Sequence, residues 1–191
     1  MRADDDNDLM LAVQAGDESA FSELVNRYQG RVANYIWQMV GDRHAAEDLA
    51  QDTFVRLYRS AQRYEPRAPF AGFLFRIATN LSLNHIRDRR RRRAFSLGGG
   101  PDERKMVLPD AKQPSPSAEA ARRERGADVR AEVDRLPDQQ RAALVLRHFG
   151  GLSYDDIARA LGASVPAVKS LLFRARSNLK DRLSGLIEGG I

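Results

Sequence analysis

Apolar residues recur at steps of three and four positions along most of the chain, which is the spacing of one buried face of an α-helix. The pattern predicts helices over residues 9–15, on either side of Gly30, over 45–61 and over 70–93. Two prolines within 64–69 predict a loop there, because proline lacks the amide hydrogen that a helix interior needs. The acidic start, residues 1–8, lacks the pattern and is expected to be a frayed end.

The stretch 136–183 predicts a helix-turn-helix. Ser153 stands three residues before Asp156, the spacing of a capping box, and Gly162 is expected to end the helix that begins there. Ser164 then caps a second helix. This helix carries a buried stripe at Val168, Leu172, Ala175, Leu179 and Leu183. The alternative is a helical hairpin inside an ordinary core, which would use the same caps and the same stripe.

The composition changes between these helical parts. Residues 94–117 contain three glycines and four prolines and show little periodicity, which is typical of a linker. A helix resumes over 118–135, and Pro137 opens the next one. The sequence therefore predicts an all-α protein with two helical domains, 1–93 and 118–191, joined by a flexible linker over 94–117.

Charge and composition narrow the classes of partner. Lys and Arg total 31 against 26 Asp and Glu, a net charge of +5, which favours a polyanionic partner. The chain has no cysteine and its three histidines are scattered, so no metal or cofactor is expected. No apolar run approaches membrane-spanning length, and the acidic start is not a signal peptide, so we expect a cytoplasmic protein without membrane insertion.

A run of five arginines, residues 89–93, ends the long predicted helix. The positive charges complement the negative end of the helix dipole and would bind phosphates through release of counterions. The alternative is a solvated basic helix end with no ligand.

Three stretches together resemble bacterial sigma factors of the extracytoplasmic-function (ECF) group. LPDQQRAALVLRHFGGLSYDDIARALG followed by VKSLLFRAR is similar to the C-terminal domain of that family. AAEDLAQDTFVRLYR resembles its core-polymerase-binding helix, and FAGFLFRIATNLSLNHIRDRRR resembles its segment for promoter melting and −10 recognition. The three motifs occur in the family's order and at its spacing, and the resemblance covers nearly the whole chain.

The resemblance implies a non-catalytic subunit that binds core RNA polymerase, directs it to promoters and assists their opening. The N-terminal domain would open the −10 element as single strands, and the C-terminal domain would read the −35 element as duplex. Many family members are held inactive by an anti-sigma factor, so such a partner is expected here.

Three sets of site residues follow. The core-polymerase set is Glu47, Asp48, Gln51, Asp52 and Arg56. An acidic face suits a basic helical partner, although a solvated face with pairs such as Asp52–Arg56 would look the same.

Promoter melting requires aromatic and amide side chains beside cations, which capture bases once they unstack. The −10 set is Tyr64, Phe70, Arg76, Asn80, Asn84, Arg87, Arg90 and Arg91. Core packing is the open alternative for Phe70 and the favoured interpretation for Phe73, and the two asparagines could be plain exposed polar positions.

For the −35 element, Arg or Lys can read guanine, and backbone donors at a helix start can bind phosphate. The −35 set is Ser164, Pro166, Ala167, Lys169, Ser170, Phe173, Arg174 and Arg176.

The chain departs from the family at three positions. Family members often have Trp where Phe73 stands and Asp where Asn84 stands, and many have Arg where Leu171 stands. These changes put individual promoter contacts in question but leave the class of function intact.

Three rival functions would each require features of their own. A response-regulator activator would need a strand-helix receiver domain, an enzyme would need a nucleophile or metal cluster, and a sigma-mimicking interaction protein should lack the basic determinants. None of these fits the helical, basic chain as well.

Overall fold

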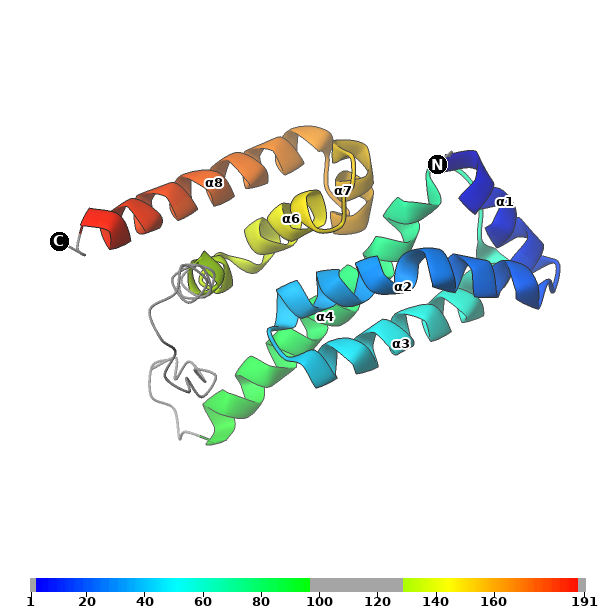
Figure 1. The fold of residues 1–191 in the computed structure, drawn as a ribbon, viewed down its shortest axis with the longest axis horizontal. Coiled ribbons are helices and arrows are strands. Elements are labelled where there is room, and N and C mark those ends of the chain that lie inside the picture. The colour runs from blue at the N-terminus through cyan, green and yellow to red at the C-terminus, as the bar shows by residue number, and fades with distance from the viewer. Residues whose placement is uncertain (1–2, 97–128, 189–191) are drawn as a thin grey trace, which may run out of the picture.

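The computed structural model describes residues 3–96 and 129–188, and every regular element in these ranges is helical (Figure 1). The N-terminal elements are α1 (Ala3–Gln14), α2 (Glu18–Val40), α3 (Arg43–Ser60), the single 3₁₀ turn η1 (Ala61–Arg63) and α4 (Phe70–Ser96). Residues 129–134 form a further helical segment, followed by α6 (Asp138–His148), α7 (Tyr154–Leu161) and α8 (Val165–Glu188). The expected all-α class is confirmed for this part of the chain.

The acidic N-terminus is not frayed as predicted, because α1 begins at Ala3 rather than near residue 9. Asp6 on this helix is only 4% exposed. Its carboxylate accepts hydrogen bonds from the Tyr28 hydroxyl at 2.6 Å and from Arg27 at 2.8 Å. A buried carboxylate with two donors is stable in a core, so the first turns of α1 are held against α2.

Helix α2 runs without a break through Gly30, where the sequence predicted helical turns on either side. The helix ends at Gly41, whose φ of 74° lies in the left-handed region that glycine adopts without strain. The Asp42 side chain then accepts a hydrogen bond from the Ala45 amide and begins α3. The sequence predicted a new helix from residue 45, and α3 begins two residues earlier, at Arg43.

Helix α4 is the longest described element and extends past the predicted end at Arg93 to Ser96. The predicted loop at 64–69 precedes it and is confirmed. The helix therefore includes residues 94–96, which the sequence assigned to the linker, while 97–117 lie outside the described residues.

The helix-turn-helix forms as the caps predict. The Ser153 hydroxyl accepts the Asp156 amide at 3.1 Å, and Gly162 ends α7 with a φ of 62°. The Ser164 hydroxyl accepts the Ala167 amide at 3.3 Å and begins α8. The predicted stripe is buried at Val168, Leu172 and Ala175, which are 0 to 2% exposed.

The N-terminal and C-terminal helices share one hydrophobic core. A single cluster contains Leu24 and Phe75 from the first group and Val145 and Ile157 from the second. Helix α7 packs on α4 and α6 packs on α2, so α6 and α7 lie between α8 and the N-terminal helices (Figure 1). Within the described ranges, none of the helices is both long enough and apolar enough to span a membrane.

Candidate nucleic-acid interface

The predicted polymerase-binding residues lie on the outer face of α3, opposite the buried residues Ala46, Ala50 and Leu57. Glu47, Asp48, Gln51, Asp52 and Arg56 are all exposed. Two pairs link them along the helix, Arg43 to Glu47 at 3.2 Å and Arg56 to Asp52 at 3.9 Å. Exposed pairs of this kind hold their charges only weakly, which leaves the acidic groups available to another partner.

Two apolar residues on the same helix were missed from the sequence. Val55 and Tyr58 are 45% and 49% exposed, although residues of this size are usually more covered. The Tyr58 ring meets Phe21 of α2 edge-on, with ring centroids 5.0 Å apart. Both residues are apolar yet lie outside the buried stripe of α3, and this mismatch in the sequence could have revealed them. The outer face of α3 therefore combines carboxylates with exposed apolar surface.

Helix α4 presents a row of polar side chains to solvent at three- and four-residue steps. Arg76, Asn80, Asn84, Arg87 and Arg91 are all exposed. The opposite side of the helix is buried, and there the Thr79 and Ser82 hydroxyls donate to backbone carbonyls one turn back. Neighbours within the row interact only loosely, as Arg87 approaches the Asn84 amide oxygen at 3.4 Å. Five members of the predicted −10 set thus share one free face.

Tyr64 and Phe70, in contrast, are buried, at 5% and 1% exposure. Their rings meet at 6.3 Å, and Phe70 also contacts the Tyr28 ring at 5.3 Å. Burial raises the pKa of the Tyr64 phenol to about 12. The structure corrects their expected place beside DNA, because neither ring is available to stack on a base in this conformation. Phe73 is half-buried against Tyr64, consistent with the core packing favoured for it.

The run of arginines does not act as one group. Arg90 forms a bidentate ion pair with Asp138 of α6, with N–O distances of 2.8 and 2.9 Å. Arg89 donates to the Val40 carbonyl at 3.1 Å, and burial lowers the pKa of its guanidinium. Arg90, predicted to face the −10 element, is therefore bound to the C-terminal helices here.

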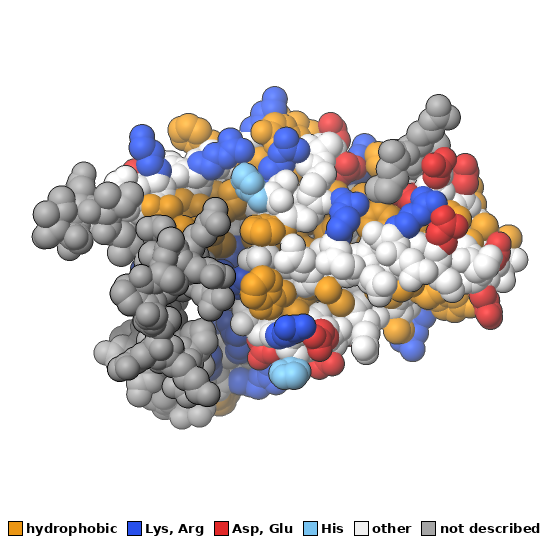
Figure 2. Space-filling model, viewed as in Figure 1, with side chains coloured by type: hydrophobic (Ala, Val, Ile, Leu, Met, Phe, Trp, Pro, Cys, Tyr) orange, Lys and Arg blue, Asp and Glu red, His pale blue; other side chains and the backbone are white. Residues whose placement is uncertain are grey.

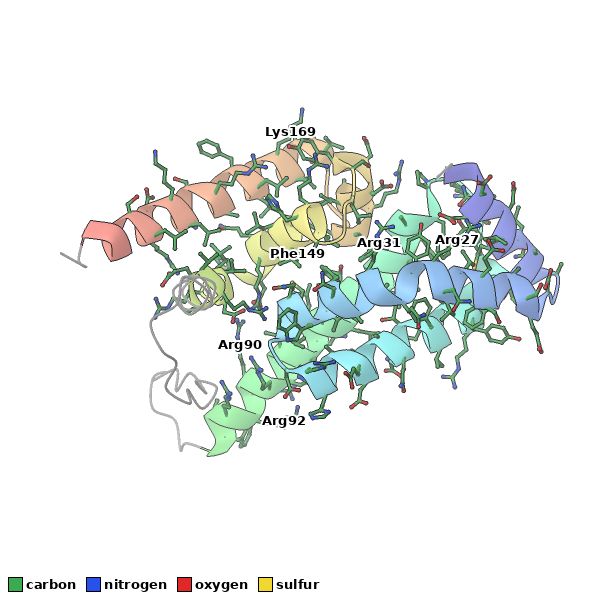
Figure 3. The ribbon with its side chains drawn as sticks, in the orientation of Figure 1. Arg27, Arg31, Arg90, Arg92, Phe149 and Lys169 are labelled. Carbon is green, nitrogen blue, oxygen red and sulfur yellow. The ribbon has the colours of Figure 1, made fainter. Side chains whose placement is uncertain are left out.

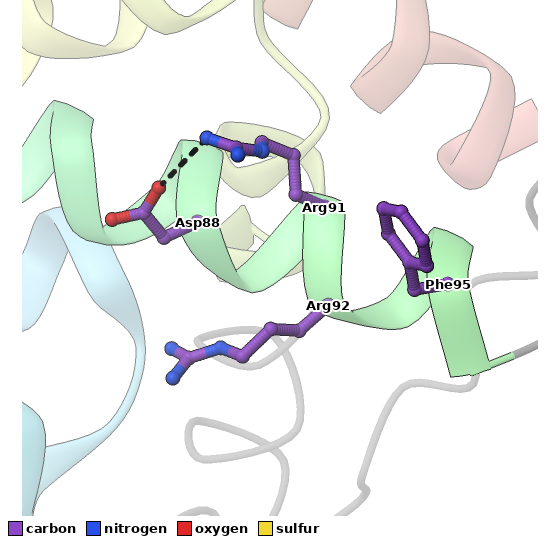
Figure 4. Close-up of a pocket in the computed structure, with 4 residues that line it drawn as sticks. All are labelled: Asp88, Arg91, Arg92 and Phe95. Carbon is purple, nitrogen blue, oxygen red and sulfur yellow. Dashed lines mark ion pairs between the residues drawn. The ribbon is translucent and has the colours of Figure 1, made fainter.

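The end of α4 combines an exposed aromatic ring with arginines, a feature that the sequence analysis did not single out. Phe95 is 90% exposed, and with Asp88, Arg91 and Arg92 it lines a shallow hollow (Figure 4). Arg91 approaches the Asp88 carboxylate at 3.7 Å. An exposed aromatic ring beside guanidinium groups can bind a nucleotide by stacking and by phosphate contact.

Helix α8 separates its buried and exposed residues cleanly. Exposed members are Ser164, Pro166, Ala167, Lys169, Ser170, Phe173, Arg174 and Arg176, which is the whole predicted −35 set. Phe173 is 74% exposed despite its size. Figure 2 shows cationic side chains along the α8 edge, and Lys169 points away from the remaining helices in Figure 3. Leu171, where family members often have Arg, is half-buried and packs against the core.

Comparison with known proteins gives a family match for both halves of the chain. Residues 24–92 match the family model for sigma-70 region 2, and residues 127–179 match that for sigma-70 region 4. The ECF RNA polymerase sigma-E factor of Haemophilus influenzae is 31% identical over 95% of this chain and 97% of its own length. The chain is an ECF sigma factor. The family membership that the three motifs suggested is confirmed.

Other relatives agree with this assignment. The sigma-H factor of Pseudomonas aeruginosa is 37% identical to this sigma factor and is covered over 95% of its length. SigE of Mycolicibacterium smegmatis is 40% identical, but this chain spans only 65% of it. The α3 face and the α4 row lie in the region 2 match, and the α8 face lies in the region 4 match.

Two solved structures share the fold. CnrH, in complex with the cytosolic domain of CnrY, superposes with a TM-score of 0.69 at 25% identity and covers 98% of this sigma factor. RpoE of Bartonella quintana, in complex with the anti-sigma factor NepR, has a TM-score of 0.65 at 24% identity and covers 86%.

Proposed function

We propose that this sigma factor binds core RNA polymerase through the outer face of α3 and holds promoter DNA with two separate surfaces. The α4 row faces the −10 element and the exposed face of α8 faces the −35 element. The observation that carries the proposal is that each matched family region contains helices that are buried on one side and expose polar residues on the other. The protein acts as a non-catalytic initiation subunit, in the bacterial cytoplasm where the polymerase works.

The α3 face suits a protein partner with a basic helix. Interfaces combine an apolar centre with a charged rim, and here Val55 and Tyr58 supply the first while Asp48 and Asp52 supply the second. The carboxylates would orient the encounter and raise its rate, and burial of the apolar pair would slow dissociation.

The two DNA surfaces divide the tasks of opening and reading. Asn80 and Asn84 can hydrogen-bond the edges of unstacked bases while Arg76, Arg87 and Arg91 hold phosphates. On α8, Lys169 and Arg174 have the donors to read guanine in the major groove. Exposed Phe173 adds apolar surface in the middle of the same face.

Control by an anti-sigma factor is part of the proposal. CnrH, which matches this chain over nearly its full length, was solved with the cytosolic domain of CnrY bound. We therefore expect a partner protein to bind this sigma factor and withhold it from polymerase.

Charge reversal on α3 tests the polymerase contact. Asp48→Lys with Asp52→Lys should weaken binding to core polymerase by ten-fold or more, because two carboxylates facing a basic partner become repulsive. The matched control is Asp5→Lys with Asp8→Lys, which reverses two exposed carboxylates on α1. Equal affinity of both variants for core polymerase, with unchanged circular dichroism, would remove the α3 assignment.

A second experiment tests the division of DNA surfaces. The free protein should bind promoter duplex weakly, and addition of core polymerase should give specific footprints over both elements, because two weak contacts on one scaffold reinforce each other. Tight, promoter-specific footprints from the free protein would contradict this. Sequencing the RNA started by the reconstituted enzyme would define the promoters.

A further inference from the structure

The exposed row of α4 does not stop at Arg91. Phe95 lies four residues further along the helix, which is the same step that separates Arg76, Asn80 and Asn84. Its side chain is 90% exposed, more than any other large apolar side chain that the structure describes. At about 1.5 Å per residue, the row from Arg76 to Phe95 is roughly 28 Å long. The ring therefore adds one helical turn to the surface that we assign to the −10 element.

The ring of Phe95 has charged groups around it. Figure 4 shows Arg91 and Phe95 rising from the same side of the helix, with the hollow between them, while Arg92 extends in another direction. The Asp88 carboxylate lies 3.7 Å from Arg91 and draws its guanidinium away from the ring. The hollow is therefore bounded by a flat aromatic ring on one side and by the stem of an arginine on the other.

The charge of this helix end indicates the kind of partner. Every residue of 87–93 except Asp88 is arginine, so the ring stands at the end of a strongly cationic segment. An apolar partner without negative charge would gain from the ring and lose from the desolvated guanidinium groups. A nucleotide suits both, because its base stacks on an aromatic ring and its phosphate binds a guanidinium. The end of α4 therefore fits a nucleic acid better than a protein surface.

The stacking contact further selects an unpaired strand. A base inside a duplex has both faces covered by its neighbours, so an aromatic ring can stack only on a base that has left the duplex. The α4 row already faces the element that opens, in the function proposed above. The nearest source of an unpaired base is therefore the edge of that opened element.

We propose that Phe95 is a base-stacking residue at the end of the −10 surface, where an unpaired promoter base lies on its ring beside Arg91 and Arg92 holds an adjoining phosphate. The inference rests on the proposed function, because it takes α4 as the surface that faces the opened element. Stacking is tolerant of sequence, since every base has a flat face. Phe95 thus adds affinity for opened DNA without adding to the sequence that is read.

Binding of a short single-stranded oligodeoxynucleotide to the free full-length chain tests the ring, because Phe95 is exposed without polymerase. Phe95→Ala should bind at least five-fold more weakly than wild type, as expected for loss of one base stack. Phe95→Tyr keeps an aromatic ring and should bind like wild type. The matched control is Phe149→Ala, which removes a phenyl group that is 44% exposed at the end of α6, and it should also bind like wild type.

An abasic strand of the same length separates stacking from any general effect of the substitution. On that strand Phe95→Ala and wild type should bind equally, because there is no base to stack. An equal loss on the ordinary and abasic strands, or no loss on either, would overturn the proposal. Binding that is at least ten-fold tighter to RNA of the same sequence would overturn the assignment to promoter DNA.

Salt dependence distinguishes the ring from the phosphate contact. Arg92→Ala should reduce the slope of log affinity against log salt concentration by about 0.7, the value for one phosphate of a single strand. Phe95→Ala should lower the affinity and leave this slope unchanged. The control is Arg59→Ala, which removes an exposed arginine from α3 and should change neither quantity. An equal slope for Arg92→Ala and Arg59→Ala would overturn the phosphate contact.

The complex with core polymerase places the contact on the promoter. A fluorescent adenine analogue, whose emission falls on stacking, is substituted in turn at the positions that border the −10 element. Wild type should quench one of these positions, and Phe95→Ala should leave it bright. Equal emission with both proteins at every bordering position would overturn the proposal. Wild-type protein that opens no position and starts no RNA would count against the proposed function, while the oligonucleotide measurements would still decide the role of Phe95.

Discussion

The buried carboxylate of Asp6 gives a prediction that can be worked out from the contacts. In Asp6→Ala, the Tyr28 hydroxyl, on a side chain only 2% exposed, loses the acceptor 2.6 Å away. Leaving a buried polar group without a partner costs about 1–3 kcal/mol. Arg27 loses one of its two carboxylate partners and keeps the other, Glu23. We therefore expect the free energy of unfolding to fall by about 2–4 kcal/mol, with the larger part from the orphaned hydroxyl.

A double-mutant cycle separates the two contributions. Urea unfolding followed by circular dichroism should show that Asp6→Ala with Tyr28→Phe is more stable than Asp6→Ala alone, because the second change removes the orphaned hydroxyl. The recovered stability should be about 1 kcal/mol or more. A loss below about 0.5 kcal/mol in the single variant, or no recovery in the double variant, would refute the reasoning.

Three shorter predictions follow from the caps, the buried phenols and the α8 face. Ser153→Ala should lower the free energy of unfolding, measured in urea, by about 1 kcal/mol, because α7 loses its N-terminal cap. An unchanged free energy of unfolding would show that this cap does not stabilise the protein. Above about pH 10 the unfolded chain releases phenolic protons that folded Tyr64 retains, so the free energy of unfolding should fall as pH rises. Tyr64→Phe should make that fall shallower, and an identical pH profile would contradict the burial argument. Arg174→Ala should weaken binding to a duplex that carries the −35 element, because Arg174 is one of the two exposed donors assigned there to guanine, and unchanged affinity in a gel-shift titration would contradict that assignment.

The parts of the fold that the sequence predicted are those set by near neighbours along the chain. The caps of α7 and α8 depend on residues three positions apart, and the prolines of 64–69 act on their own backbone. The buried stripe of α8 follows from helical period alone. Such features need no knowledge of distant segments, and the structure reproduces them.

The features that sequence reasoning missed depend on distant partners. Asp6 is held by Tyr28, which lies 22 residues away, and Arg90 by Asp138, which lies 48 residues away. Without those partners in view, an acidic start looks frayed and a basic run looks like a phosphate-binding surface. Tyr64 and Phe70 show the same limit, because an aromatic residue beside a loop gives one pattern whether its ring is buried or exposed.

The packing of α7 on α4 has a consequence at Gly72, near the start of α4, where an added Cβ would lie only 3.4 Å from the Asp156 Cα. Only the smallest side chains are compatible with α7 in its present position. A larger residue would push the helix-turn-helix away from α4. Because Gly72 belongs to none of the three recognition surfaces, such a change would alter how the two groups of helices pack without removing any residue of those surfaces.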